Sequence, residues 1–344
     1  MDKQEPILTD LINARGEPAF GVMTSPVGRV NYMDYDLRSP MDRPRSRLSR
    51  FLGFNQFQFA SLCGPDFIAG VAVVDLRLVG NGFAYVFDFK TRELKEFSCL
   101  TPAALGTFLP VTPDDGVSYC RWRGARLEVD AHSVQRGRDV RVKVTRCLEV
   151  AGQMREPSRF QPLRVCSRAG YNGWVYTQKA AGLPVTGEIL TPGHRYVLDE
   201  NCRAGYDWSC GFMRRETAWN WASISACLPD GRSLGLNLAA GVNETGVTEN
   251  ALWLDHRLLK LDLAVFRYNR YQPDQPWQIE TSDKRVKLEF QPLGHRVEKI
   301  NAWLLASNFR QFFGYYSGEV RTALGEVIRL DQVPGLAEDH YAKW

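Results

Sequence analysis

The chain has 344 residues, of which 44% are hydrophobic, 24% charged and 12% aromatic, and its formal net charge is +4. This length is enough for two ordinary domains with cores of their own. The small net charge gives no electrostatic reason to expect nucleic acid as a partner. The most apolar run, residues 67–79, is interrupted by Asp75 and Arg77, so no integral membrane segment is predicted.

The eight cysteines contain no CxxC pair, and neither they nor the five histidines are spaced as metal ligands. The sequence therefore predicts no metal site, and without a glycine-rich phosphate loop it predicts no cofactor. Acidic residues and Pro6 precede any apolar run, which is not the pattern of a signal peptide. We expect a cytoplasmic protein with reduced, mostly buried thiols.

Residues 1–50 are rich in Pro, Gly and Asp and are predicted to form an irregular leader. The leader ends in a basic run that contains Arg43, Arg45, Arg47 and Arg50. Such a run is typical of a solvated linker. It also fits a patch that contacts phosphate or acidic headgroups, because guanidinium groups match these oxygens, and the sequence leaves both interpretations open.

Strand patterns begin at residue 51, and we assign residues 51–183 to a first β-barrel. The expected strands cover residues 54–63, 66–79, 83–89, 125–134 and 138–150, with a turn at Gly80-Asn81-Gly82. In the last of these strands valines alternate with Arg141 and Lys143, which is the pattern of a half-exposed antiparallel sheet.

A second series of strands leads us to assign residues 184–344 to a second β-barrel. The expected strands cover residues 219–228, 233–238, 249–254, 258–266, 286–290, 309–321 and 326–330. Helical periodicity is scarce, and residues 297–306 are the only stretch that suggests a helix. The fold class is therefore all-β, with two consecutive antiparallel barrels packed side by side and few short helices.

One hairpin, residues 219–238, separates two kinds of side chain by parity. A three-residue turn pairs Leu228 with Arg232, which keeps each kind on one face. The even face is aliphatic and must be core: Ala222, Ile224, Ala226, Leu228, Leu234, Leu236 and Leu238. The odd face carries indoles among small polar residues: Trp219, Trp221, Ser223, Ser225, Ser233, Gly235 and Asn237.

The odd face suits a ligand cavity in a barrel lumen or an interdomain cleft, because indoles supply a flat wall and Ser or Asn orients a ligand. The alternative is that the indoles pack against a neighbouring element and bond locally through their N–H groups. The candidate ligand-binding residues are Trp208, Trp219, Trp221, Ser223, Asn237, Asn250 and Trp344.

Three carboxylates and one histidine near these indoles are the candidate catalytic residues: Asp207, Glu216, Glu249 and His340. Burial beside aromatic rings raises the pKa of a carboxyl group and makes it a general acid near neutrality. The alternatives are that Glu216 pairs with Arg214 or Arg215, and that Asp207 caps a turn. His340, in the segment AEDHYAKW, belongs either to the cavity or to the anchor of the C-terminal tail.

The segments GYDWSCGFMRRETAWNWAS, DGRSLGLNL, VTENALWLD and AEDHYAKW resemble an uncharacterised bacterial family, domain of unknown function 2804. FIAGVAVVDL, YVFDF, VYTQK, PW and QFFGYYSGEV match it in the same order, so the resemblance spans residue 50 to the chain end. This family is similar, more faintly, to the two-barrel lipocalin-like group that contains AttH and the carotenoid hydratases. The resemblance implies two calycin-type barrels, with the functional residues in the second barrel or between the two, and it supplies no established activity.

Three functions remain open at this level. The protein could bind a hydrophobic or aromatic small molecule, or it could be an acid-base enzyme, such as a hydratase, isomerase or cyclase, that acts on a hydrophobic, isoprenoid-like substrate. It could also be an interaction protein that presents an exposed aromatic face. The sequence does not define an oligomeric state.

Overall fold

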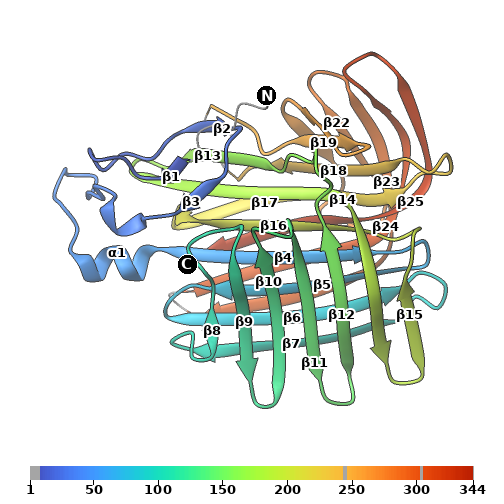
Figure 1. Cartoon of the computed structure of the whole chain (residues 1–344), viewed down its shortest axis with the longest axis horizontal. Coiled ribbons are helices and arrows are strands. Elements are labelled where there is room, and N and C mark those ends of the chain that lie inside the picture. The colour runs from blue at the N-terminus through green and yellow to red at the C-terminus, as the bar shows by residue number, and fades with distance from the viewer. Residues whose placement is uncertain (1–7, 243–245, 303–304, 344) are drawn as a thin grey trace.

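The computed structural model describes residues 8–242, 246–302 and 305–343. Nearly all of their regular structure is β-strand, in two large curled antiparallel sheets (Figure 1). One sheet forms a near-barrel and the other a half-barrel, which agrees with the two lipocalin-like barrels predicted from the sequence. Within these residues, no helix is long and apolar enough to cross a lipid bilayer.

The first sheet runs in the order β7-β6-β5-β4-β16-β14-β12-β11-β10-β9-β8, and β13, β15 and β2 join it at its side. Its strands are β4 (Asn55–Cys63), β5 (Phe67–Asp75), β6 (Val79–Asp88), β7 (Leu94–Pro102), β8 (Thr107–Phe108), β9 (Gly116–Trp122), β10 (Ala125–His132), β11 (Gly137–Val144), β12 (Leu148–Arg155), β13 (Leu163–Ala169), β14 (Gly173–Thr191), β15 (His194–Leu198) and β16 (Arg203–Phe212).

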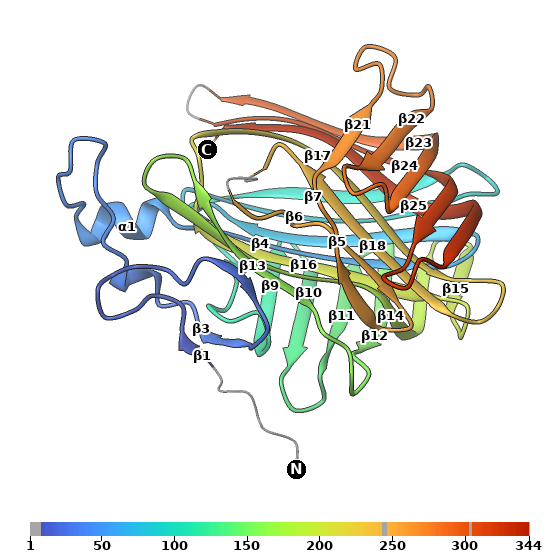
Figure 2. The same cartoon turned by 90° about the horizontal axis from the view of Figure 1, so that it is seen from above.

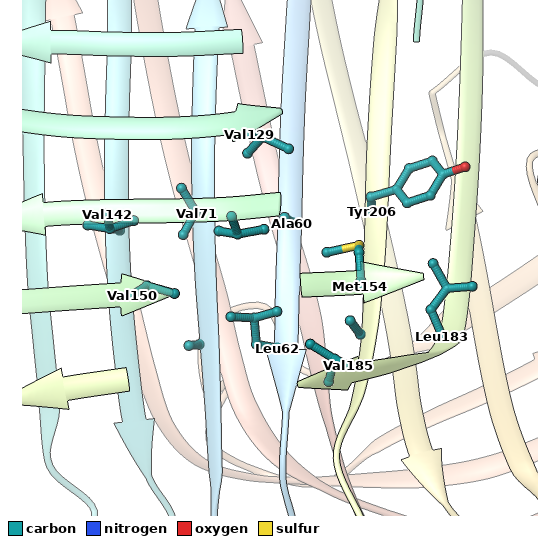
Figure 3. Close-up of a cluster of buried hydrophobic side chains, with 14 of the residues drawn as sticks. Ala60, Leu62, Val71, Val129, Val142, Val150, Met154, Leu183, Val185 and Tyr206 are labelled. Atoms are coloured by element: carbon teal, nitrogen blue, oxygen red, sulfur yellow. The ribbon is translucent and has the colours of Figure 1, made fainter. Parts of the chain in front are cut away.

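The core of the first barrel lies where β9–β12 run across β4–β7 (Figure 1). Small and branched side chains from both layers meet there, among them Ala60, Leu62, Val71, Val129 and Val142 (Figure 3). The turn expected at residues 80–82 is wrong: Gly80 and Gly82 lie inside β6, and the chain turns at residues 76–78. A Cβ on Gly82 would come within 2.7 Å of Cys120 Sγ in the crossing layer, so these glycines permit close packing rather than a turn.

The second sheet has nine strands in the order β20-β19-β18-β17-β25-β24-β23-β22-β21. They are β17 (Glu216–Cys227), β18 (Ser233–Ala240), β19 (Ala251–Leu254), β20 (Arg257–Lys260), β21 (Ala264–Arg267), β22 (Trp277–Thr281), β23 (Val286–Ala302), β24 (Leu305–Arg321) and β25 (Val327–Lys343). The helix expected at residues 297–306 is wrong, because Val297 and Ile300 pair with Arg310 and Ser307 in the β23–β24 hairpin.

The leader covers one flank of the first sheet (Figures 1 and 2). It contains β1 (Leu8–Asp10), β2 (Gly21–Met23), β3 (Val27–Arg29), the 3-10 turn η1 (Tyr32–Asp34) and the helix α1 (Arg47–Gly53). Leu11, Val27 and Val30 close an aromatic cluster there, so this flank is buried. Within the basic run, Arg50 Nη1 donates to the Met33 carbonyl at 2.9 Å.

The chain passes from the first sheet to the second between β16 and β17. The proposed domain boundary at residues 183 and 184 falls inside β14, and β15 and β16 pair with β14 in the first sheet. β14 shifts register between Ala180 and Leu183, and this bulge lies against β17 and β18.

Small residues of the odd face of the β17–β18 hairpin hold the two sheets together at this bulge. Ser225 Oγ accepts from Gly182 N at 3.1 Å, and Ser233 Oγ donates to Gly182 O at 2.9 Å. A Cβ on Gly235 would come within 2.3 Å of the Ala181 carbonyl oxygen. This end of the odd face is therefore a close backbone contact and has no room for a cavity.

We expect Gly235→Ala to lower the free energy of unfolding by about 2 kcal/mol, because the added methyl group meets backbone atoms that cannot rotate away. Chemical denaturation measures the loss. Gly53→Ala is the matched control, since its Cβ would meet only the Phe212 ring at an ordinary 3.6 Å, and it should cost less than 0.5 kcal/mol, the usual limit for an uncrowded site. Equal stability of the two variants would contradict the close contact.

Candidate functional site

A cavity of about 340 Å³ lies between the two sheets, beyond the aromatic end of β17. Its walls are the outer face of β4–β6 with β14 and β16, and the face of β17, β23, β24 and β25 that looks toward them. The lining side chains include Phe57, Phe59, Asn81, Phe83, Lys179, Asp207, Ser209, Thr217, Trp219, Trp221, Ala239, Glu249, Arg296, Glu298, Ile300, Ala306, Ser307, Phe309, Glu338, His340 and Ala342.

Strand register explains how residues far apart in sequence line one wall. Side chains at alternate positions of a strand share a face, and paired residues on neighbouring strands stand side by side. One row of paired residues across the second sheet consists of Ala239, Trp221, Glu338, Gln311 and Arg296. The adjacent row reads Trp219, His340, Phe309 and Glu298.

The indoles form one side of the cavity and also bond within the protein. Trp221 Nε1 donates to Asn237 Oδ1 at 2.8 Å, and its ring meets Phe59 edge-on with centroids 5.9 Å apart. Trp219 Nε1 donates to Glu338 Oε2 at 3.4 Å, and its ring lies 4.1 Å from that of His340. The N–H groups of both indoles thus have partners within the protein, and both side chains border the cavity.

A buried lysine joins two of the candidate acids. Lys179 Nζ lies 2.5 Å from Asp207 Oδ2 and 3.2 Å from Glu249 Oε2, and each of the three side chains is less than 15% exposed. Ser209 and Thr177 also donate to Asp207 Oδ1, at 2.8 and 3.2 Å. Burial opposes the charge of Lys179, but the two carboxylates outweigh it and raise the pKa of its ammonium. Asp207 and Glu249 thus form a charged triad with Lys179, which ties β14, β16 and the segment before β19 together.

Glu338 is a partly buried carboxyl group in the cavity wall. Its Oε1 accepts from Gln311 Nε2 at 2.6 Å and its Oε2 accepts from Trp219 Nε1, and no cation pairs with it among the described residues. Burial raises its pKa to about 7, although both hydrogen bonds act in the opposite direction. Near neutrality Glu338 is therefore divided between a carboxylic acid and a carboxylate.

His340 lies two residues beyond Glu338 on the same face of β25. Its Nε2 is 3.1 Å from Ser307 Oγ, and its ring packs between Trp219 and Phe309. Burial, helped by the charge of Arg296, lowers the pKa of His340 to about 3. His340 is therefore a neutral imidazole at physiological pH and is a member of the cavity wall as well as an anchor of β25.

Several candidate residues lie outside the cavity. Glu216 is exposed at the start of β17 and pairs with Lys343 at 3.4 Å rather than with Arg214 or Arg215. Trp208 points to the opposite face of β16 from Asp207 and is fully buried under the leader, where it packs against Tyr176. Trp344 lies outside the described residues.

Three polar candidates lie near the cavity but do not line it. Asn237 bonds to Trp221 and donates to the Glu249 carbonyl at 2.6 Å, so it fixes an indole relative to the triad. Asn250 is fully buried and bridges Ala239 N to the carbonyl of Asp262. Ser223 is buried between the sheets, 7% exposed, and does not line the cavity.

Lys179, Arg296 and Glu338 line the cavity but are not among the candidates selected from the sequence. Glu338 alternates with His340 in AEDHYAKW, and strand periodicity would have placed the two on one face. Lys179 and Arg296 come from distant strands, and no local pattern identifies them. Among the residues that the structure describes, no group of three or more His, Cys, Asp or Glu side chains could hold a metal ion.

A protein-family model matches nearly the whole chain. The model of the family described as "Domain of unknown function (DUF2804)" matches residues 4–344. The chain belongs to the DUF2804 family. The resemblance identified from sequence motifs is thereby confirmed, whereas comparison with curated proteins finds no match.

Solved structures share the fold of this DUF2804 protein at low sequence identity. CghA with Sch210972 is 8% identical with a TM-score of 0.53 and covers 84% of this chain and 88% of its own, and a second CghA structure is 11% identical with a TM-score of 0.53 and 97% coverage of each. An AttH-like protein from Nitrosomonas europaea is 12% identical, with a TM-score of 0.50 and coverage of 84% of this chain and 92% of its own. Kievitone hydratase from Nectria haematococca is 10% identical, with a TM-score of 0.46 and coverage of 83% and 87%. Identities this low show the fold alone.

The raised pKa of Glu338 makes stability depend on pH. Between its ordinary pKa near 4.3 and the folded value of about 7, the native state holds a proton that the unfolded state has released, so rising pH destabilises the fold. Glu338→Gln removes this loss, and its stability relative to wild type should increase by about 2 kcal/mol from pH 5 to pH 8.

Chemical denaturation at both pH values tests this expectation. Glu216→Gln is the control, because it makes the same substitution at a solvent-exposed end of the same sheet. A stability difference between Glu338→Gln and wild type that is the same at pH 5 and pH 8 would show that Glu338 ionises as it does in water.

Proposed function

We propose that this DUF2804 protein binds a hydrophobic, largely planar small molecule in the cavity between its two sheets. The observation that carries the proposal is a wall of six aromatic side chains around an internal space of about 340 Å³: Phe57, Phe59, Phe83, Trp219, Trp221 and Phe309. Concave, mostly apolar sites with a few convergent polar groups are typical of small-molecule binding. The similar fold of CghA, whose structure was determined with Sch210972, is compatible with a ligand in such a protein.

The same geometry argues against the interaction-protein hypothesis. Trp221 is only 7% exposed, and Phe83 and Phe309 are 7% and 8% exposed. A docking face for another chain presents its aromatic side chains to solvent as a contiguous patch. These rings instead face one another across the space between two sheets of one chain.

Binding should be saturable and confined to the cavity. We expect the wild-type protein to bind one equivalent of 2-ethylnaphthalene in equilibrium dialysis. Ala306 is half-buried and lines the cavity, so Ala306→Trp should fill part of it and weaken binding at least tenfold, equivalent to about 1.4 kcal/mol.

Val134→Trp, in an exposed turn of the first sheet, is the size-matched control and should leave the affinity within twofold. Failure of the wild-type protein to bind any apolar probe would contradict the proposed function. Saturable binding that Ala306→Trp does not weaken would place the site elsewhere.

A second candidate function, acid-base catalysis on the bound molecule, is favoured by Glu338. A carboxyl group with a pKa of about 7, next to aromatic faces that stabilise a developing positive charge, has the properties of a general acid. Asp207 and Glu249 are less suited to this role, because Lys179 holds both as its counter-ions. In this function Glu338 transfers a proton to a carbon or oxygen of the bound substrate, and His340 remains a neutral hydrogen-bonding group.

Deuterium incorporation from D₂O into lipophilic polyenes and enol ethers, followed by mass spectrometry, tests for catalysis. The rate should fall about tenfold per pH unit above pH 7 as Glu338 loses its proton. Glu338→Gln should lower the rate at least about 100-fold, the usual contribution of a general acid, and keep 2-ethylnaphthalene affinity within threefold. Unchanged incorporation in Glu338→Gln would exclude Glu338 as the proton donor.

A further inference from the structure

Arg296 is a fully buried guanidinium in the cavity wall, with its side chain 2% exposed. Its Nε donates to Glu96 Oε2 at 3.1 Å and its Nη2 donates to Glu298 Oε2 at 3.0 Å. The rings of Phe83 and Phe309 lie 4.0 and 5.2 Å from its central carbon. Two carboxylates thus occupy one edge of the group and aromatic rings contact it, which fixes its orientation.

The third nitrogen of this guanidinium, Nη1, differs from Nε and Nη2. Arg296 Nη1 is buried and has no hydrogen-bond partner among the described residues. A buried donor that stays unpaired costs free energy, and more so when it carries charge. Arg296 lines the cavity of the proposed function, and a molecule bound there can supply the missing acceptor when the guanidinium turns to meet it, because Nη1 is covered as it stands.

The charge around Arg296 restricts what that acceptor can be. Glu96 and Glu298 already supply two negative charges against one positive charge, so an anionic ligand would bring a third carboxylate to the same guanidinium. A neutral carbonyl oxygen accepts from Nη1 without adding charge, and it has no hydrogen that would need an acceptor of its own.

We infer that the ligand of this cavity carries an uncharged carbonyl group, a ketone, ester or amide, whose oxygen accepts a hydrogen bond from Arg296 Nη1. This inference rests on the proposed function and names the class of its ligand: an apolar, planar body with one neutral oxygen acceptor at the Arg296 end. The apolar part of the ligand lies against Trp219, Trp221 and Phe309. These side chains belong to the two rows of paired residues across the second sheet that end at Arg296 and Glu298.

A rival partner lies within the protein. Gln311 is paired with Arg296 in the β23–β24 ladder, and its Oε1 is also buried without a partner in the described part of the chain. A small rotation of the two side chains could let Arg296 Nη1 donate to Gln311 Oε1, or a water molecule could accept from Nη1. In either case a carbonyl group on the ligand would add no affinity. Affinities of matched probes decide between these cases.

Three naphthalenes of nearly equal size separate the outcomes on the wild-type protein at pH 8: 2-acetylnaphthalene, 2-ethylnaphthalene and 2-naphthoate. The neutral ketone should bind at least tenfold more tightly than the hydrocarbon, and the carboxylate at least tenfold more weakly than the ketone. Hydrocarbon and ketone of equal affinity, or a carboxylate that binds most tightly, would overturn the inference and leave the proposed function standing. Absence of binding by all three probes would instead contradict the proposed function.

Arg296→Met should remove the preference for the ketone over the hydrocarbon, so that the affinities of these two probes for the variant lie within threefold of each other. The side chains of Glu96 and Glu298 are 43% and 21% exposed, so water can solvate them when the guanidinium is gone. Arg321→Met, which removes an exposed partner of Glu319, is the control and should keep the preference. A ketone preference that survives in folded Arg296→Met protein would overturn the role of Arg296, and the wild-type comparison remains decisive if that variant does not fold.

Discussion

The contact between the β14 bulge and the β17–β18 hairpin is the constraint on which the rest of the structure depends. Gly182 and Gly235 meet there backbone to backbone, and Ser225 and Ser233 bond to Gly182 across the contact. Because no larger side chain stands between them, the two sheets are fixed at this end. The size of the side chains along the same face then determines how far the sheets separate, and Trp221 begins the part where a space remains.

Charge is distributed unevenly around that space. Lys179 lies between Asp207 and Glu249 and forms an ion pair with each of these buried carboxylates. Among the described residues Glu338 accepts hydrogen bonds from two neutral donors, and burial raises its pKa toward neutrality. Arg296 pairs with two carboxylates, and its Nη1 still has no hydrogen-bond partner in the part of the chain that the structure describes. Neighbouring acids of one cavity thus differ in chemistry because their partners differ, which is how folds assign separate roles to similar groups.

Strand pairing brings side chains that are distant in sequence onto one surface. Glu338 and His340 belong to one strand, whereas Arg296, Phe309 and Trp219 come from three others. Pairing of β17, β25, β24 and β23 sets them side by side in two rows, so a shift of one residue in any ladder would turn the polar groups to the opposite face. Register is therefore as important to this cavity as the identity of its residues.

The sequence by itself determined the all-β class, the pairing of Leu228 with Arg232 and the two faces of the β17–β18 hairpin, because strand periodicity and turn chemistry are local. It could not determine which part of the odd face is open, since that depends on the β14 bulge about 40 residues earlier in the chain. Nor could it show that Glu216 lies in solvent while Glu338 lies in the cavity. Burial and partners come from strands distant in sequence, so only the tertiary structure decided which acids share the site.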